Sequence, residues 1–120
     1  MSSFTSLLDV SPLSDGRNWQ LRRKFTYHIG SKRSRKFIKV PRNFVTDFAS
    51  VPSFLWSWIP SWSKYGKAAV IHDRLYTTHE VSRAMADAIF LEAMQVSGTP
   101  KWKARLMYQA VRMFGGLAWL

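Results

Sequence analysis

The second half of the chain contains three stretches in which apolar residues have helical spacing. These stretches limit most strongly what this sequence can fold into. The first covers residues 67 to about 77 and carries Ala68, Ile71 and Leu75 on one face. Two further stretches follow after short connections, and short connections favour antiparallel neighbours. The second half therefore predicts three α-helices that pack side by side.

The second helix is expected over residues 81–96, with Ser82 as its N-cap and Gly98 as its stop signal. The third begins at Thr99, which a proline follows, and ends at the glycine pair 115–116. Its predicted inward stripe consists of Trp102, Leu106, Ala110 and Met113. Its solvent face is assigned to the basic residues Lys101, Lys103, Arg105 and Arg112.

The residue pattern of the first half predicts short strands. Residues 19–21 alternate in polarity, and residues 25–29 are rich in β-branched and aromatic side chains. A turn near Gly30 precedes a second short strand over residues 37–40. The sequence thus predicts an α+β fold in one domain, residues 1–120. Its parts are an N-terminal antiparallel β-hairpin or small sheet (17–46), an aromatic loop (47–63) and a region of three antiparallel-packed helices (64–116).

Charge is the strongest feature of the composition. The chain has 18 Lys and Arg against 7 Asp and Glu, a formal net charge of +11, and ten basic residues without any acid lie between Arg17 and Thr46. Such a balance favours an acidic partner, either nucleic acid, an anionic lipid surface or an acidic protein. The candidate anion-binding or nucleic-acid-binding residues are Arg22, Arg23, Lys24, Lys32, Arg33, Arg35 and Lys36. The alternative is a solvated charged face.

Other function classes are excluded or left without support by composition. The chain has no cysteine, which removes disulfides, thiolate catalysis and Cys-type zinc sites. The N-terminus carries no secretion signal, and no uncharged stretch is long enough to predict a transmembrane segment. The tryptophans at 56, 58 and 62 suit either a membrane interface or a core beneath the aromatic loop.

The candidate chemistry lies on the first two helices. His72 shares the inward face of Ala68 and Leu75, and Asp87 lies on an otherwise apolar face of the second helix. An unpaired buried carboxylate is costly, so we expect Asp87 to pair with His72. Such a pair fixes the imidazole tautomer and leaves the second ring nitrogen as a base. The alternative is a structural hydrogen bond that braces two helices.

A metal site is a further candidate. Asp73 follows His72 directly and points to a different side of the helix, and Asp47 lies in the aromatic loop. Oxygen-rich ligand sets suit hard cations such as Ca²⁺. Asp73 and Asp47, together with His72, are therefore candidate metal-site residues.

The motifs resemble those of an uncharacterised phage and prophage family, domain of unknown function 1353. The resemblance rests on the strings T-D-F-A-S-V-P at 46–52, H-D-x-L-Y at 72–76 and A-D-x-x-F at 86–90, and covers roughly residues 19–114. It implies a phage context, with the host cytoplasm or the virion as the expected location. It implies no reaction.

A looser similarity connects the H-D-x-x-Y motif to the phospholipase A2 superfamily. That similarity implies a general base at His72, a calcium ligand at Asp73, an orienting carboxylate at Asp87 and a supporting hydroxyl at Tyr76. The glycine-rich calcium loop of the superfamily is absent, since only Tyr65-Gly66 stands upstream. The leading functional prediction is a phage-associated, metal-dependent, hydrolase-like protein. The alternative is a non-enzymatic basic virion or counter-defence protein that binds nucleic acid or an acidic partner.

Overall fold

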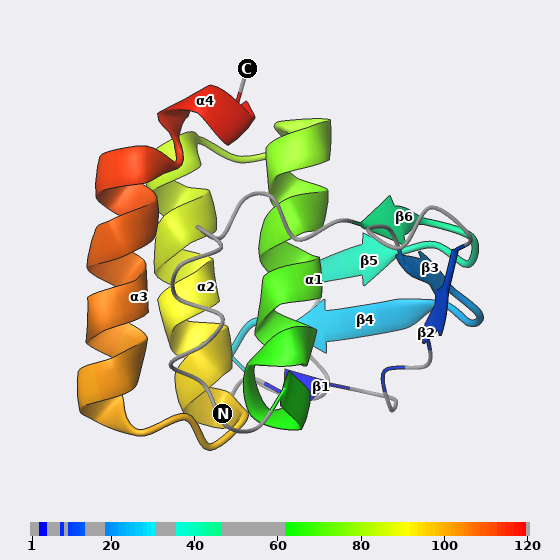
Figure 1. Cartoon of the computed structure of the whole chain (residues 1–120), viewed down its shortest axis with the longest axis horizontal. Helices are drawn as coiled ribbons and strands as arrows, with labels where there is room; N and C mark the ends of the chain where they lie inside the picture. Colours follow the sequence, from blue (N-terminus) through cyan, green and yellow to red (C-terminus); the bar gives the residue numbers. More distant parts are fainter. Residues whose placement is uncertain are drawn as a thin grey trace. The chain divides into compact units, whose positions relative to one another are not determined.

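The computed structural model describes residues 3–4, 8, 10–13, 19–30, 36–46 and 62–119. The chain divides into two compact units, Met1–Asp47 with the strands and Phe48–Leu120 with the helices, and each is described by itself (Figure 1). The predicted α+β class is confirmed. The expectation of a single domain stays a prediction, and residues 47–61 of the predicted aromatic loop lie outside the described residues.

The strand unit contains two small antiparallel sheets, each of three strands, in the described part of the chain. One has the order β1-β4-β5 and the other the order β2-β3-β6. The strands are β1 (Ser3–Phe4), β2 (Val10–Pro12), β3 (Trp19–Leu21), β4 (Phe25–His28), β5 (Phe37–Val40) and β6 (Val45–Thr46).

Strands β4 and β5 form the hairpin that the sequence predicts. They pair in antiparallel register, with Phe25 opposite Val40 and Tyr27 opposite Ile38. All four of these side chains are buried, because alternate residues of a strand point to the same face. Gly30, with a φ of 93°, takes the left-handed conformation that glycine adopts without strain in the connection between them. Strand β3 does not join this hairpin and pairs instead with β2 and β6.

The helical unit contains three long helices side by side and a short fourth (Figure 1). They are α1 (Trp62–Thr78), α2 (Arg83–Val96), α3 (Lys101–Phe114) and α4 (Gly116–Trp119). Ser82 is the N-cap of α2, as expected, and its hydroxyl accepts a hydrogen bond of 3.1 Å from the amide of Met85. Helix α1 starts at Trp62, five residues before the predicted start. No helix of the described residues is long and apolar enough to cross a membrane.

The predicted inward stripe of α3 is wrong for three of its four residues. Trp102, Leu106 and Met113 are 62%, 39% and 73% exposed, whereas Ala110 is buried. The other buried residues of α3 are Ala104, Met107 and Val111. Helix α3 has two apolar stripes, and periodicity alone does not say which of them meets the neighbouring helices. The face that carries the two alanines is buried, since small side chains let helices approach closely.

Candidate functional site

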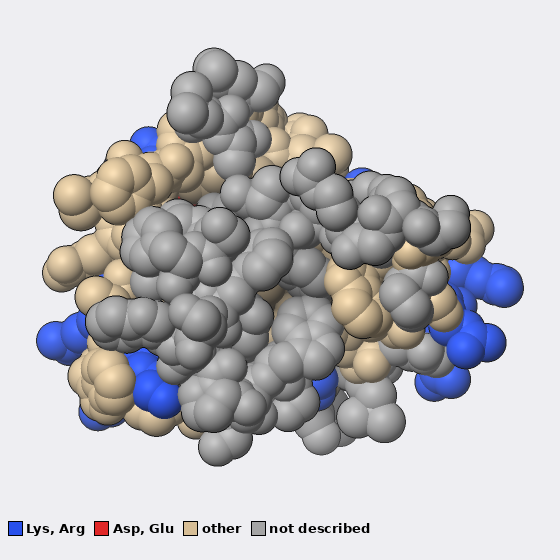
Figure 2. All heavy atoms as spheres, viewed as in Figure 1, with Lys and Arg blue, Asp and Glu red and all other residues tan. Residues whose placement is uncertain are grey.

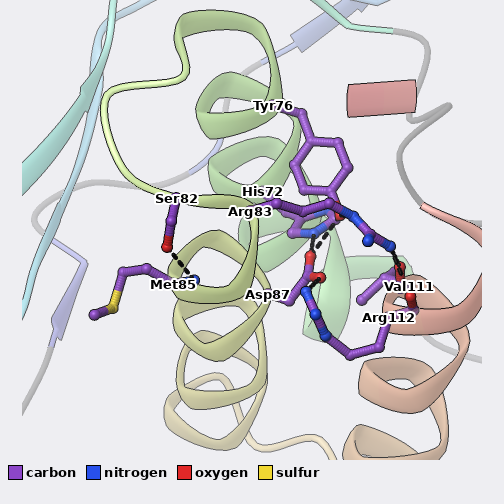
Figure 3. A network of polar contacts seen from close by, with 8 residues as sticks. All are labelled: His72, Tyr76, Ser82, Arg83, Met85, Asp87, Val111 and Arg112. Carbon is purple, nitrogen blue, oxygen red and sulfur yellow. Dashed lines mark hydrogen bonds and ion pairs between the residues drawn. The ribbon is translucent and has the colours of Figure 1, made fainter. Parts of the chain in front are cut away.

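The antiparallel pairing of α1 with α2 brings the predicted imidazole and carboxylate together. His72 from α1 and Asp87 from α2 lie 2.7 Å apart, between Nε2 and Oδ1, and both side chains are fully buried (Figure 3). One turn further along α1, Tyr76 lies next to Arg83, which is one turn before Asp87 on α2. One turn forward along α1 thus corresponds to one turn backward along α2. This antiparallel register places the side chain of His72 next to that of Asp87.

The carboxylate of Asp87 accepts hydrogen bonds from three side chains. Tyr76 donates its hydroxyl proton to Oδ1, the oxygen that also contacts His72, at 2.6 Å. Arg112 from α3 donates from Nη1 to Oδ2 at 2.8 Å (Figure 3). These donors compensate the loss of water around a buried charge. Three helices therefore meet at one ionised carboxylate.

Arg83 connects this cluster to the end of α3. Its Nη2 donates to the backbone carbonyls of Val111 and Arg112, at 2.8 and 2.7 Å, and its Nε contacts the Tyr76 hydroxyl at 3.3 Å. The Val111 carbonyl also accepts a hydrogen bond of 2.8 Å from the amide of Gly115, and a cation at the C-terminal end of a helix suits the helix dipole. Arg83 thus caps α3 and holds it against α1 and α2.

Gly115, the C-cap of α3, has no room for a side chain. A Cβ atom there would lie 2.6 Å from the Tyr76 hydroxyl, 3.3 Å from Arg83 Nη2, and in collision with the carbonyl oxygen of Val111. Gly116, the next residue, has open space around its Cα. The glycine at 115 is therefore required by the close approach of α3 to Tyr76 and Arg83.

The burial of the cluster sets its protonation states. Desolvation lowers the pKa of His72, against the opposing effect of the hydrogen bond to Asp87, so the imidazole is neutral at pH 7. Burial by itself would raise the pKa of Asp87, but the hydrogen bonds from His72, Tyr76 and Arg112 outweigh it and lower this pKa. Burial, followed by the hydrogen bond to Asp87, raises the pKa of the Tyr76 hydroxyl.

These states assign the tautomer of His72. Because Asp87 is ionised and can only accept, Nε2 of the neutral imidazole carries the ring proton and Nδ1 carries the lone pair. Aromatic rings hold the imidazole in place, since Tyr76 and Phe90 have their ring centroids 4.2 and 4.5 Å from it. Trp119 of α4 contacts Tyr76 edge to face at 5.1 Å. The hydrogen bond to Asp87 and packing on these aromatic side chains therefore orient the ring.

The predicted metal residues are not brought together by the described part of the chain. Asp73 lies on α1 and is partly buried, and Asp47 lies outside the described residues. The described residues contain no group of three or more His, Cys, Asp or Glu side chains placed to hold a metal ion. Since Ca²⁺ takes six to eight oxygen ligands, these residues do not by themselves make a calcium site.

Only some of the predicted anion-binding residues lie in the described part of the chain. Arg22, Arg23, Lys24 and Lys36 are all exposed on the strand unit, and Lys32, Arg33 and Arg35 lie outside the described residues. Figure 2 shows the basic side chains that are visible at the edges of the molecule, and no acidic side chain of the described residues appears on this face.

Sequence reasoning missed two residues of the cluster, Arg83 and Arg112. Arg112 was assigned to the solvent face of α3, but its side chain is 36% exposed and its guanidinium reaches the buried Asp87. The physical reason is the length of the side chain, which spans from the surface to the interior. The position of Arg83 four residues before Asp87 was an available signal, because residues at this spacing share a helix face.

Comparison with known proteins gives a family match and two similar proteins. A sequence model described as "Protein of unknown function (DUF1353)" matches residues 19–111. Two uncharacterized proteins of Sinorhizobium fredii are similar: y4jT is 38% identical over 78 residues, 63% of this chain and 23% of y4jT, and y4iH is 39% identical over 72 residues, 58% of this chain and 30% of y4iH. The chain spans less than a third of the length of these relatives. No solved structure matches it significantly.

Proposed function

The chain belongs to the DUF1353 family of proteins of unknown function, and we propose that it is a hydrolase in which His72 is the general base and Asp87 orients it. One observation carries the proposal: the imidazole Nε2 of His72 and the hydroxyl of Tyr76 share a single oxygen of a buried carboxylate. This arrangement agrees with what the similarity to the phospholipase A2 superfamily implies for these positions.

The proposed reaction is attack of water on an ester carbonyl. In this proposal the helix interface around the fully buried His72 opens locally, and Nδ1 of His72 then accepts a proton from water as the water oxygen forms a bond to the carbonyl carbon. The bond between that carbon and the ester oxygen then breaks, and the imidazolium returns the proton to the departing alkoxide, which leaves an acid and an alcohol. Asp87 stays ionised and stabilises the imidazolium through Nε2, while Tyr76 and Arg112 fix the carboxylate.

Calcium is part of the same proposal, with Asp73 on α1 as its candidate ligand. The cation would supply charge stabilisation of the oxyanion. The support is the sequence similarity and the place of Asp73 directly after His72, because the described residues do not assemble the ligand shell. A phage context, with the host cytoplasm or virion as location, is likewise proposed from the family resemblance.

The test is release of fatty acid from glycerophospholipid vesicles, titrated at constant pH with added Ca²⁺ and with a chelator. We expect His72→Gln to reduce the rate by about a hundredfold or more, since positioned proton transfer contributes about 10²–10⁴-fold. Asp73→Asn should remove the calcium dependence. His28→Gln, in the strand unit, is the matched control and should leave the rate unchanged. Absence of release by the wild-type chain, or full activity of His72→Gln, would refute the proposal.

The second candidate function is binding of a polyanion by the strand unit. It is favoured by the exposure of Arg22, Arg23, Lys24 and Lys36, in a segment without acidic residues. Replacing all four by Gln should weaken retention on duplex DNA and lower the salt slope of binding by about 0.9 for each phosphate that the variant no longer neutralises. In that case the buried cluster is a structural brace. An unchanged salt slope would contradict this function.

A further inference from the structure

Helix α3 exposes an apolar stripe that faces away from its buried side. Trp102, Leu106 and Met113 are 62%, 39% and 73% exposed. At about 100° per residue they fall within an arc of about 40° on the helix surface. The buried residues Ala104, Met107 and Val111 occupy the opposite side. An exposed stripe of large apolar side chains on one helix is characteristic of a docking surface.

The stripe is bordered by positive charge on both sides. Helix α3 contains four basic residues and no Asp or Glu. Lys101 and Arg105 lie on one side of the stripe and Lys103 on the other, with Lys103 Nζ 5.4 Å from the centroid of the Trp102 ring. Figure 2 shows basic side chains next to uncharged surface along the edge that α3 forms in Figure 1. The occupant of the stripe must therefore be apolar at its centre and anionic at its margin.

We propose that this face of α3 docks onto an anionic lipid surface. An amphipathic helix of this kind lies along the interface, with its apolar side chains about 5–10 Å below the headgroups and its Lys and Arg side chains at the level of the phosphates. From Trp102 to Met113 the stripe is about 17 Å long, at 1.5 Å per residue. Over this length the helix lies parallel to the bilayer surface. Tryptophan is favoured at this depth because its ring is apolar and its N–H is polar.

Other occupants fit less well. A second copy of this chain would bring two stripes with basic borders together, in a protein of net charge +11. A stable protein partner covers about 800 Å² with some 20–30 residues, far more than three apolar side chains on one helix. Single-stranded nucleic acid stacks its bases on aromatic rings, and in this stripe only Trp102 is aromatic. Lipid needs no complementary shape and is matched by both the charge and the apolar content.

The experiment is co-sedimentation of the full chain with vesicles of ether-linked lipids, which contain no ester bond. Binding is thus measured independently of the hydrolase proposal. Vesicles of ether-linked phosphatidylcholine are compared with vesicles that also contain ether-linked phosphatidylglycerol. The test variant carries Trp102→Gln, Leu106→Gln and Met113→Gln, which keep the helix propensity of an exposed face. The matched controls Met85→Gln and Phe37→Gln remove apolar side chains that are 52% and 51% exposed on other elements.

We expect binding to the anionic vesicles only, and a loss of about tenfold or more in the triple variant, equivalent to at least about 1.4 kcal/mol. The controls should bind like wild type, and Lys101→Gln with Arg105→Gln should weaken binding and its salt dependence. The unfolding midpoint of the triple variant should match that of wild type. The proposal is overturned by no binding to anionic vesicles, by equal binding to both compositions, or by unchanged binding of the triple variant.

Discussion

The two units of this protein offer a contrast between a buried charge and exposed charges. In the helical unit one carboxylate, Asp87, is fully buried and accepts hydrogen bonds from three side chains. In the strand unit Arg22, Arg23 and Lys24 are exposed to solvent, as the described cations of that segment generally are. A buried charge is held by specific partners, and its removal leaves those partners unsatisfied. An exposed charge is screened by water, so it contributes little to stability.

Asp87→Ala is expected to cause the largest loss of unfolding free energy. The change removes the acceptor that His72, Tyr76 and Arg112 share, and breaking a buried ion pair typically destabilises by about 3–5 kcal/mol. Denaturant unfolding measures the loss. Glu80→Ala, which removes an exposed carboxylate, is the control and should change stability by no more than about 0.5 kcal/mol. Similar losses of unfolding free energy in the two variants would show that the burial of Asp87 does not determine its contribution to stability.

A smaller effect is expected from Gly115→Ala. The added methyl group meets Tyr76, Arg83 and the Val111 carbonyl, and overpacking of this kind destabilises by about 1–3 kcal/mol. Gly116→Ala meets nothing within 4 Å and should be within about 0.5 kcal/mol of wild type. Thermal unfolding of the pair gives the comparison. If both alanines were tolerated equally, the close approach at Gly115 would be without consequence.

The pH dependence of stability sharpens the contrast further. Burial lowers the pKa of His72 in the folded state, so below the unfolded value of 6.5 the unfolded chain binds the proton more readily and stability falls. The slope approaches about 1.4 kcal/mol per pH unit for one such group. The lowered pKa of Asp87 adds a second loss at lower pH, beginning near its unfolded value of 3.8. Below pH 6.5, His72→Gln should therefore show a flatter profile than wild type. Equal slopes in the two proteins would contradict a neutral buried imidazole.

The same lowered pKa predicts the acid limb of the proposed hydrolysis. A base that stays neutral below pH 6.5 keeps its activity there, and the rate should fall only at more acidic pH. A pH–rate profile of fatty-acid release in the range where the fold is intact measures this. A midpoint at or above 6.5 would indicate that the active base is not the buried His72.

The smallest effect is expected from the exposed cations. Replacing Arg22, Arg23, Lys24 or Lys36 singly by Gln should change the unfolding free energy by no more than about 0.5 kcal/mol. Denaturant unfolding at low and high salt is the measurement. A loss of about 2 kcal/mol or more at any one position would show that the strand unit also depends on specific charge pairs.

The sequence predicted most where one short-range pattern decides the outcome. The hairpin of β4 and β5 and the N-cap at Ser82 follow from residue types over a few positions, and both are present. The contact between His72 and Asp87 followed from the cost of leaving a buried carboxylate unpaired. In the first two cases neighbouring residues decide the outcome, and in the third the energetic cost of an unpaired buried carboxylate does.

The failures have a common physical cause, which is that the outcome depends on a distant partner. Strands β1, β2 and β6 are two or three residues long, too short to show a period, and exist through pairing with β3 and β4. The exposed stripe of α3 was assigned to the core because two faces of that helix are apolar. Arg83 and Arg112 entered the site through contacts 25 or more residues away along the chain.

The cap that Arg83 places on α3 has a consequence for how the helical unit opens. Its guanidinium ties two backbone carbonyls of one helix to a tyrosine of another, so the last turn of α3 cannot fray while these contacts persist. When they break, we expect the end of α3 to move away with Arg112, so that the buried carboxylate loses one of its donors. Amide hydrogens at the end of α3 should then exchange together with those around Asp87, as one cooperative unit, rather than at the fast rate of an ordinary helix terminus.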